Sequence, residues 1–139
     1  VEIDLLCRGS CCLVPGVPGL SEKIRVRSII DRFLEHSRIY IFGVGEDAEV
    51  YLSSADWMPR NFRRRVEAMF PILEPSLKKR IIESIVPILQ GDNIKARQML
   101  PDGNYERVAP AKGDPPRRAQ IQFLDEMIQN DLLDDDDDD

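Results

Sequence analysis

The sequence predicts a mixed α/β fold, an α/β sandwich in which a mixed sheet is flanked by helices. Strand-like and helix-like runs follow one another in the order β, α, β, β, β, α, β, α. The 139 residues are 42% hydrophobic and 32% charged, which suits one globular domain with its own core. No apolar run reaches the roughly 18 residues that a membrane span requires. These observations favour a single α/β domain.

The chain is expected to open with a strand, a break and a helix. Residues 3–13 are apolar and β-compatible, and prolines and glycines interrupt residues 15–19. Ser21 is a candidate helix cap, and the apolar residues after it have the i, i+3, i+4, i+7, i+8 spacing of one buried helix face. That stripe consists of Val26, Ile29, Ile30, Phe33 and Leu34.

Further elements are expected along the rest of the chain. Residues 38–42 and 49–55 predict an antiparallel hairpin, because both runs are rich in β-branched and aromatic residues. A later helix is expected to begin at Pro75 and to be interrupted at Pro87. The remaining expectations are strands at residues 66–72 and 94–99, a loop at 101–116 and an amphipathic helix at 121–132.

Charge divides the chain into a domain and a tail. The formal net charge is −6, and the six aspartates of residues 134–139 account for all of it. We assign residues 1–130 to the domain and residues 131–139 to a disordered acidic tail, because a run of like charges repels itself. Most basic groups of residues 8–65 are arginines, whose guanidinium groups match phosphate oxygens. This composition indicates a phosphate-bearing ligand.

The cysteines do not predict a disulfide framework or a zinc site. Cys7, Cys11 and Cys12 leave an odd thiol in any pairing, and with His36 they lack the ligand spacing of structural zinc sites. We expect them to be small buried apolar residues, and we expect no metal ligands in this chain.

His36 is the only histidine of the chain and therefore the only candidate for histidine chemistry. In an extended segment, period two puts His36 and Arg38 on the same face. A neutral imidazole can attack phosphorus or accept a proton, and a charged one can steady a phosphate. A structural or capping role for His36 remains the alternative.

Other polar residues could support a phosphate site. Ser53, Ser54 and Asp56 end a predicted strand, and Arg60 opens a cluster with Arg63, Arg64 and Arg65. The alternatives are a polar strand end with Trp57 packed in the core and a solvated basic turn. Arg8 lies inside an apolar run, where its charge would need an anion as partner. The sequence contains no P-loop, protein-kinase or Rossmann fingerprint.

Several long stretches resemble one known family. They are Arg8-Gly9 and residues 15–22, 24–28, 32–39 and 50–58. They look like the C-terminal catalytic domain of polyphosphate kinase, the ATP-dependent, polyphosphate-synthesising type, over about residues 1 to 130. The resemblance implies a phospholipase-D-like fold in which two similar halves each present a histidine to a shared phosphate site. The chain begins in an apolar strand without Met, so we expect a piece of a longer protein.

The resemblance also implies a reaction and its participants. The family transfers the terminal phosphate of ATP reversibly to polyphosphate through a phosphohistidine. By this resemblance, His36 matches the second histidine, which contacts the nucleotide phosphate, and Arg8 matches an ATP-binding arginine. Implied partners are ATP or ADP, polyphosphate, the preceding catalytic domain and further copies of the full-length enzyme, without nucleic acid. Mg²⁺ is expected to be bound mainly by parts of the enzyme outside this chain. The expected location is the cytoplasm, with membrane association of the full-length enzyme left open.

Departures from related motifs define two rival functions. Phospholipase D enzymes carry His-x-Lys-x-x-x-x-Asp, and here Arg38 and Gly43 stand where the Lys and Asp would be. This weakens a phosphodiesterase or nuclease function, and a non-catalytic polyphosphate- or anion-binding module is the other alternative. Because the chain has one histidine, we expect the isolated piece to be inactive.

Overall fold

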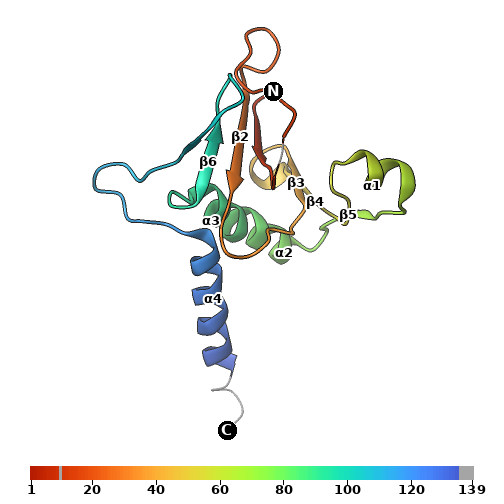
Figure 1. Cartoon of the computed structure of the whole chain (residues 1–139). Coiled ribbons are helices and arrows are strands. Elements are labelled where there is room, and N and C mark those ends of the chain that lie inside the picture. Colours follow the sequence, from red (N-terminus) through yellow and green to blue (C-terminus); the bar gives the residue numbers. More distant parts are fainter. Residues whose placement is uncertain (10, 135–139) are drawn as a thin grey trace. The chain divides into compact units, whose positions relative to one another are not determined.

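The computed structural model describes residues 1–9 and 11–134 (Figure 1). The chain divides into two compact units. The first unit comprises Val1–Glu35 and Pro87–Asp139, and the second comprises His36–Val86. The combination of helices and strands confirms the predicted α/β class. The strands form two separate sheets, however, where the sequence predicted one mixed sheet.

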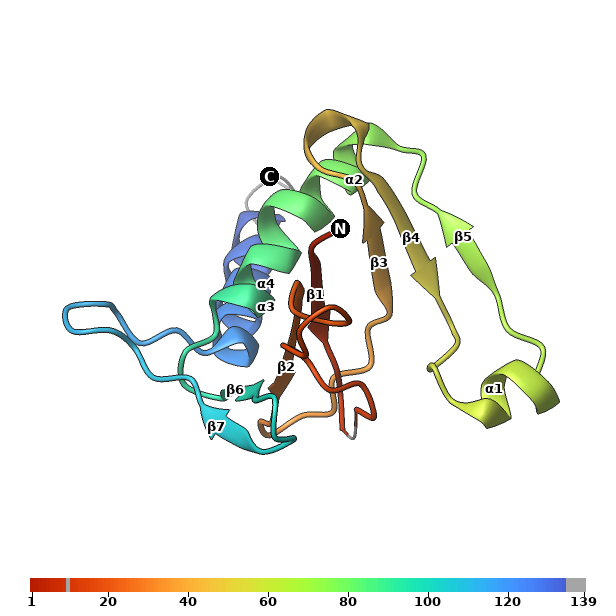
Figure 2. The ribbon, with the colours of Figure 1, turned by 90° about the horizontal axis from the view of Figure 1, so that it is seen from above.

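The first unit is built on the mixed sheet. Strand β1 (Ile3–Leu6) pairs in parallel with β2 (Ile24–Ile29), and β6 (Ala96–Met99) pairs with β2 in the antiparallel direction. Strand β7 (Tyr105–Arg107) then pairs antiparallel with β6. These strands, labelled in Figure 2, form one sheet in the order β1-β2-β6-β7. The strand predicted for residues 3–13 is therefore much shorter than expected.

The predicted helix after Ser21 is wrong, because β2 occupies this part of the chain. Val26 and Ser28 are buried, whereas Arg25 between the apolar positions is exposed, so the period-two alternation of a strand prevails. Ser21 does not cap a helix. Its hydroxyl donates to the Val14 carbonyl at 2.7 Å and accepts from the Val17 amide at 3.0 Å, which closes the proline- and glycine-rich loop.

The second unit contains the predicted hairpin. Strands β3 (Ile39–Phe42) and β4 (Glu49–Ser53) pair antiparallel, and β5 (Met69–Pro71) adds to β4. The connection between β3 and β4 includes the 3₁₀ turn η1 (Gly45–Asp47), and the expected strand at residues 66–72 is reduced to β5. Helix α1 (Pro59–Arg64), which the sequence analysis did not predict, begins at a proline.

The helix predicted from Pro75 forms and is irregular before Pro87. It consists of α2 (Pro75–Arg80), the π-helical turn η2 (Ile81–Ile85) and α3 (Val86–Gly91). Proline has no N–H to donate to the carbonyl four residues earlier, so the irregular turn lies where the regular bond pattern is broken.

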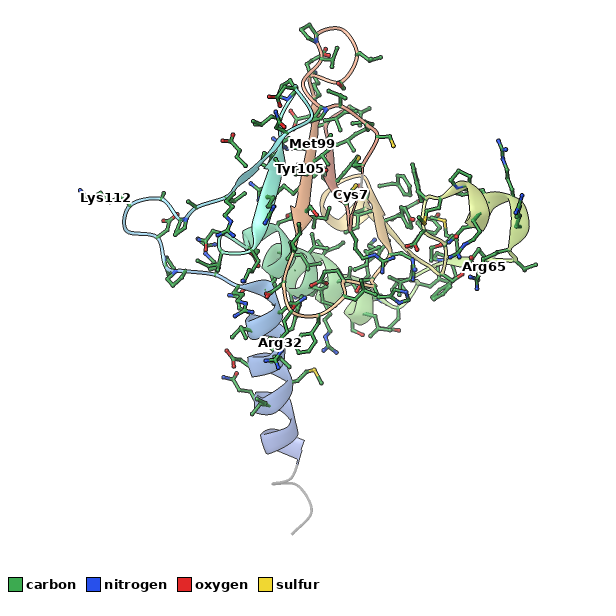
Figure 3. The ribbon with its side chains drawn as sticks, in the orientation of Figure 1. Cys7, Arg32, Arg65, Met99, Tyr105 and Lys112 are labelled. Carbon is green, nitrogen blue, oxygen red and sulfur yellow. The ribbon has the colours of Figure 1, made fainter. Side chains whose placement is uncertain are left out.

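The C-terminal part consists of an extended loop and a helix. Residues 108–116 form a loop that projects beyond β7, with Lys112 at its tip (Figure 3). Strand β7 itself lies within the stretch for which only a loop was predicted. Helix α4 (Ala119–Asp134) confirms the last predicted helix. Residues 131–134 of the predicted disordered tail are thus helical, and residues 135–139 lie outside the described residues. No helix in the described chain is long and apolar enough to cross a membrane.

The apolar core of the first unit is small. Its buried apolar side chains include Val26, Ala96, Met99 and Ala119. The expectation of buried cysteines is wrong: Cys12 is exposed, and the other cysteines are partly exposed. Burial nevertheless raises the pKa of the Cys7 thiol to about 11. Polar side chains make up a large share of the buried residues of this unit.

Asp92 is the central polar group of this interior, with 1% of its surface exposed. Its Oδ1 accepts from the amides of Ile94, Lys95 and Ala96 at 3.0, 2.6 and 2.9 Å. Its Oδ2 accepts from the amide of Ala119, the first residue of α4, at 2.8 Å. A single carboxylate therefore ties the end of α3, the start of β6 and the start of α4 together.

A second buried carboxylate, Asp31, binds the residue before α4. The Arg118 guanidinium donates to both Asp31 oxygens, at 2.8 and 2.6 Å, and the Asp31 side chain is 1% exposed. The hydrogen bond from Arg118 holds the pKa of Asp31 below its usual range. Asp31 therefore stabilises the fold above the pH at which it ionises in the unfolded chain, near 4. This stabilisation is lost as the pH falls through the lowered pKa.

We predict that Asp31→Asn lowers the free energy of unfolding at pH 7 and that the difference from wild type shrinks as the pH falls below about 4. Urea denaturation at pH 7 and at pH 3 measures both values. Asp4→Asn is the matched control, because the Asp4–Arg25 pair is exposed (47% and 61% for the side chains) and solvent screening weakens it. A loss for Asp31→Asn of the same size at both pH values would contradict the prediction.

Candidate functional site

The hairpin of the second unit brings His36, Arg38 and Asp56 together. His36 and Arg38 immediately precede β3, and Asp56 follows β4. The Ser53 amide donates to the Arg38 carbonyl at 3.1 Å, which extends the β3–β4 pairing back to Arg38. The antiparallel pairing thus aligns the residue before one strand with the residues that follow the other.

Arg38 binds both of its neighbours in this group. Its Nε donates to Asp56 Oδ1 at 2.9 Å, and its Nη1 donates to the His36 carbonyl at 3.2 Å. The Arg38 side chain is 15% exposed and that of Asp56 is 25% exposed. The Asp56 carboxylate raises the pKa of Arg38 further, so the guanidinium is a fixed positive charge.

The contact between Arg38 and the imidazole selects one tautomer of the neutral His36 ring. Arg38 Nη2 lies 3.2 Å from His36 Nε2. Because a guanidinium only donates hydrogen bonds, Nε2 must accept, and the proton of the neutral ring is then on Nδ1. In this arrangement the Nε2 lone pair is engaged by Arg38, and Nδ1–H is the atom available to donate to an anion. His36 itself is exposed.

The serines of the candidate site have structural partners. Ser53 Oγ accepts from the Ala55 amide at 3.0 Å. Ser54 Oγ donates to Glu67 Oε2 at 2.5 Å and accepts from the Ala68 amide at 3.0 Å. Glu67 was not among the predicted site residues, although it is the lone carboxylate within a β-rich run and such a group needs a polar partner.

Arg60 lies on α1, exposed, together with Arg63 and Arg64 of the same helix. Arg65 follows the helix and forms an ion pair with Glu67 at 3.4 Å, and its position is labelled in Figure 3. No hydrogen bond recorded for the described residues joins Arg60 to His36 or Arg38. The cluster is thus a basic surface around a short helix.

Trp57 is 79% exposed, so the alternative in which it packs in the core is wrong. Its ring stacks on Tyr40, with centroids 6.0 Å apart, and meets Phe62 edge to face at 6.5 Å. An exposed aromatic surface therefore flanks the strand end that carries Asp56.

Arg8 belongs to the first unit, whereas His36 belongs to the second. The expectation that Arg8 lies inside an apolar strand is wrong, because β1 ends at Leu6 and Arg8 is exposed. Arg8 Nη1 donates to the Glu35 carbonyl at 3.0 Å. An exposed guanidinium can be solvated by water, so the position of Arg8 does not by itself require an anion as partner.

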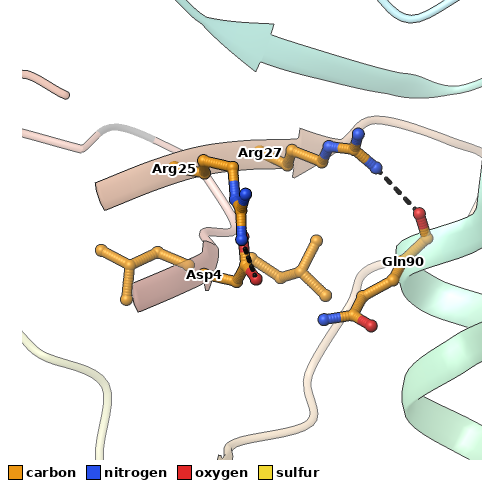
Figure 4. Close-up of a pocket in the computed structure, with 6 residues that line it drawn as sticks. Asp4, Arg25, Arg27 and Gln90 are labelled. Carbon is orange, nitrogen blue, oxygen red and sulfur yellow. Dashed lines mark hydrogen bonds and ion pairs between the residues drawn. The ribbon is translucent and has the colours of Figure 1, made fainter. Parts of the chain in front are cut away.

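The first unit also has a cavity of about 260 Å³ beside β1 and β2 (Figure 4). Arg25 Nε donates to Asp4 Oδ1 at 2.6 Å, and the same pairing lowers the pKa of Asp4. Arg27 Nη1 donates to the Gln90 carbonyl at 2.8 Å, and its Nε donates to Gln98 Oε1 at 3.1 Å. Both guanidinium groups of this cavity thus have acceptors within the protein.

The described side chains contain no group of three or more His, Cys, Asp or Glu placed to hold a metal ion. The residues that the structure describes therefore do not fit a complete Mg²⁺ site.

Known proteins are similar to this chain over most of its length. Residues 1–120 match the family model described as "Polyphosphate kinase C-terminal domain 2". Polyphosphate kinases of Rhodopirellula baltica and Burkholderia cenocepacia are 48% and 55% identical over 130 and 124 residues, which are 94% and 89% of this chain. The chain spans only 15% and 18% of the length of these relatives.

A solved structure agrees with the sequence matches. The crystal structure of polyphosphate kinase from Porphyromonas gingivalis superimposes with a TM-score of 0.85 at 42% identity, covering 96% of this chain and 20% of that one. This likeness also supports the predicted phospholipase-D-like α/β class. The chain therefore belongs to the polyphosphate kinase family and corresponds to its C-terminal domain 2.

Proposed function

We propose that this chain supplies a phosphate-binding half of an ATP:polyphosphate phosphotransferase, in which His36 donates a hydrogen bond to the transferring phosphate. The observation that carries the proposal is the contact between Arg38 Nη2 and His36 Nε2 at 3.2 Å. It leaves Nδ1–H to donate, and a donor beside a fixed cation suits an oxygen on which negative charge accumulates.

The same contact argues against His36 as the phosphorylated residue. A nucleophilic imidazole needs a free lone pair, and the Nε2 lone pair accepts from Arg38. The phosphohistidine therefore forms on a histidine outside this chain, in the preceding catalytic domain. Arg8 and Arg38 bind the phosphates of ATP, and Ser53, Ser54, Asp56 and Arg60 support the site. Two further expectations stay predictions: Mg²⁺ is held mainly outside this chain, and the isolated chain is inactive.

We expect His36→Ala in the full-length enzyme to lower kcat for polyphosphate synthesis by about 10²- to 10³-fold, the usual effect of losing a donor to a developing charge. His36→Gln keeps an N–H donor and should retain more activity. Acid-labile labelling with γ-phosphate-labelled ATP should still reach the wild-type stoichiometry in His36→Ala. Ser37→Ala, an exposed neighbour, is the control. Wild-type turnover in His36→Ala, or loss of the label, would refute the proposed role.

Arg38→Lys tests whether the several hydrogen bonds of the Arg38 guanidinium are needed to hold His36. Lysine keeps the positive charge but cannot bind Asp56, the His36 carbonyl and the imidazole together. We expect kcat to fall about tenfold or more while the enzyme stays folded, because a single charge-assisted hydrogen bond is worth about 1.5–3 kcal/mol. The control is Arg107→Lys, an exposed arginine of β7. Equal kcat values for the two variants would count against the role of Arg38.

Arg8→Ala is expected to weaken apparent ATP affinity by about tenfold to a hundredfold, the scale of one or two charge-assisted hydrogen bonds. Isothermal titration of the full-length enzyme with a non-hydrolysable ATP analogue measures this, with Arg107→Ala as control. An unchanged dissociation constant would show that Arg8 does not bind nucleotide. Tight, salt-sensitive binding of polyphosphate with no dependence on ATP would instead favour the anion-binding module.

A further inference from the structure

Residues 31–35, which lead directly into His36, have no regular secondary structure of their own. Backbone groups in such a segment need partners from elsewhere in the fold if the segment is to hold one conformation. Phe33 and Leu34 are exposed, at 55% and 72%, so apolar burial does not fix the segment. Polar contacts therefore contribute much of what holds its conformation.

Gln120, in the first turn of α4, makes most of these contacts. Its Oε1 accepts from the Phe33 amide at 2.9 Å, and its Nε2 donates to the Phe33 carbonyl at 2.8 Å. The same Nε2 donates to Glu35 Oε1 at 2.7 Å. Gln120 is 7% exposed, so water competes weakly for these groups. One side-chain amide thus fixes both polar groups of the Phe33 backbone.

Two arginines hold the ends of the same segment. The Arg118 guanidinium donates to both carboxylate oxygens of Asp31. Arg8 donates to the Glu35 carbonyl at 3.0 Å. The Glu35 carbonyl belongs to the peptide bond that joins Glu35 to His36. The segment is therefore bound at its first residue, its middle and its last peptide.

We propose that Gln120 is a positioning residue for His36: it fixes residues 33–35 so that the backbone enters His36 in the conformation that the phosphate site requires. This inference rests on the proposed function of His36. Gln120 touches no substrate in this role. Misplacement of a catalytic group by about 1 Å can cost about a hundredfold in rate even when the altered residue is remote from the reaction.

The test exchanges the polarity of one hydrogen bond in the full-length enzyme. Gln120→Glu is isosteric but replaces the Nε2 donor with an oxygen that faces the Phe33 carbonyl and the Glu35 carboxylate. Glu35→Gln alone should behave as wild type, because its amide oxygen still accepts from Gln120. The double variant restores a donor and acceptor pair between the two side chains with the roles reversed. Gln129→Glu, at an exposed glutamine of the same helix, is the matched control.

We expect Gln120→Glu to lower kcat by about ten- to a hundredfold with little change in the KM for ATP. The double variant should recover only the part of the loss that comes from the Glu35 contact, because the Phe33 carbonyl still faces an oxygen. The control should match wild type. An unchanged kcat in Gln120→Glu would overturn the inference. If Gln120→Glu does not fold, Gln120→Asn, which keeps the amide one methylene shorter, takes its place. A wild-type kcat in that variant would also overturn it.

His36→Ala in the same assay separates the inference from the function on which it rests. If His36→Ala is inactive and the Gln120 variants are normal, only the positioning role fails. If His36→Ala is fully active, the proposed function of His36 fails first.

Discussion

The carboxylate of Asp92 accepts hydrogen bonds from the backbone amides of Ile94, Lys95, Ala96 and Ala119, between 2.6 and 3.0 Å. The amides at a turn and at a helix start need acceptors, and one carboxylate satisfies several of them at once. The start of α4 is thereby tied to the start of β6, at the centre of the mixed sheet. Arg118 and Gln120 depend on this anchor, because they flank the residue whose amide it binds.

Asn93 strengthens the same anchor from the next position in the chain. Its Oδ1 accepts from the Arg117 amide at 2.7 Å, and its Nδ2 donates to the Pro115 carbonyl at 3.1 Å. The end of the long loop is therefore fixed to the turn that follows α3. A small apolar core suffices for this unit because buried polar groups, each with several partners, connect elements that are distant in sequence.

The sequence predicted the local elements better than those that depend on distant partners. The β3–β4 hairpin was correct because its strands are close in sequence, and Asp56 was identified beside it as a candidate. The apolar spacing from Val26 to Leu34 also fits a helix face, so the sequence pattern predicts a helix where residues 24–29 form a strand. Its parallel pairing with Ile3–Leu6, which decides the matter, is not visible in the local pattern. Strand β7 was missed because its stability comes from pairing with β6 inside a stretch rich in Pro and Gly.

The same distinction applies to the candidate site. His36 and Arg38 were paired correctly because they are two residues apart, but the contact of Gln120 with Phe33 spans 87 residues and no local signal marks it. The groups that meet a ligand and the groups that hold them also differ in burial. His36 is exposed, whereas Gln120, Asp31 and Asp92 are buried. Buried polar contacts resist competition from water, so they can fix an irregular segment while the imidazole at its end stays exposed to solvent.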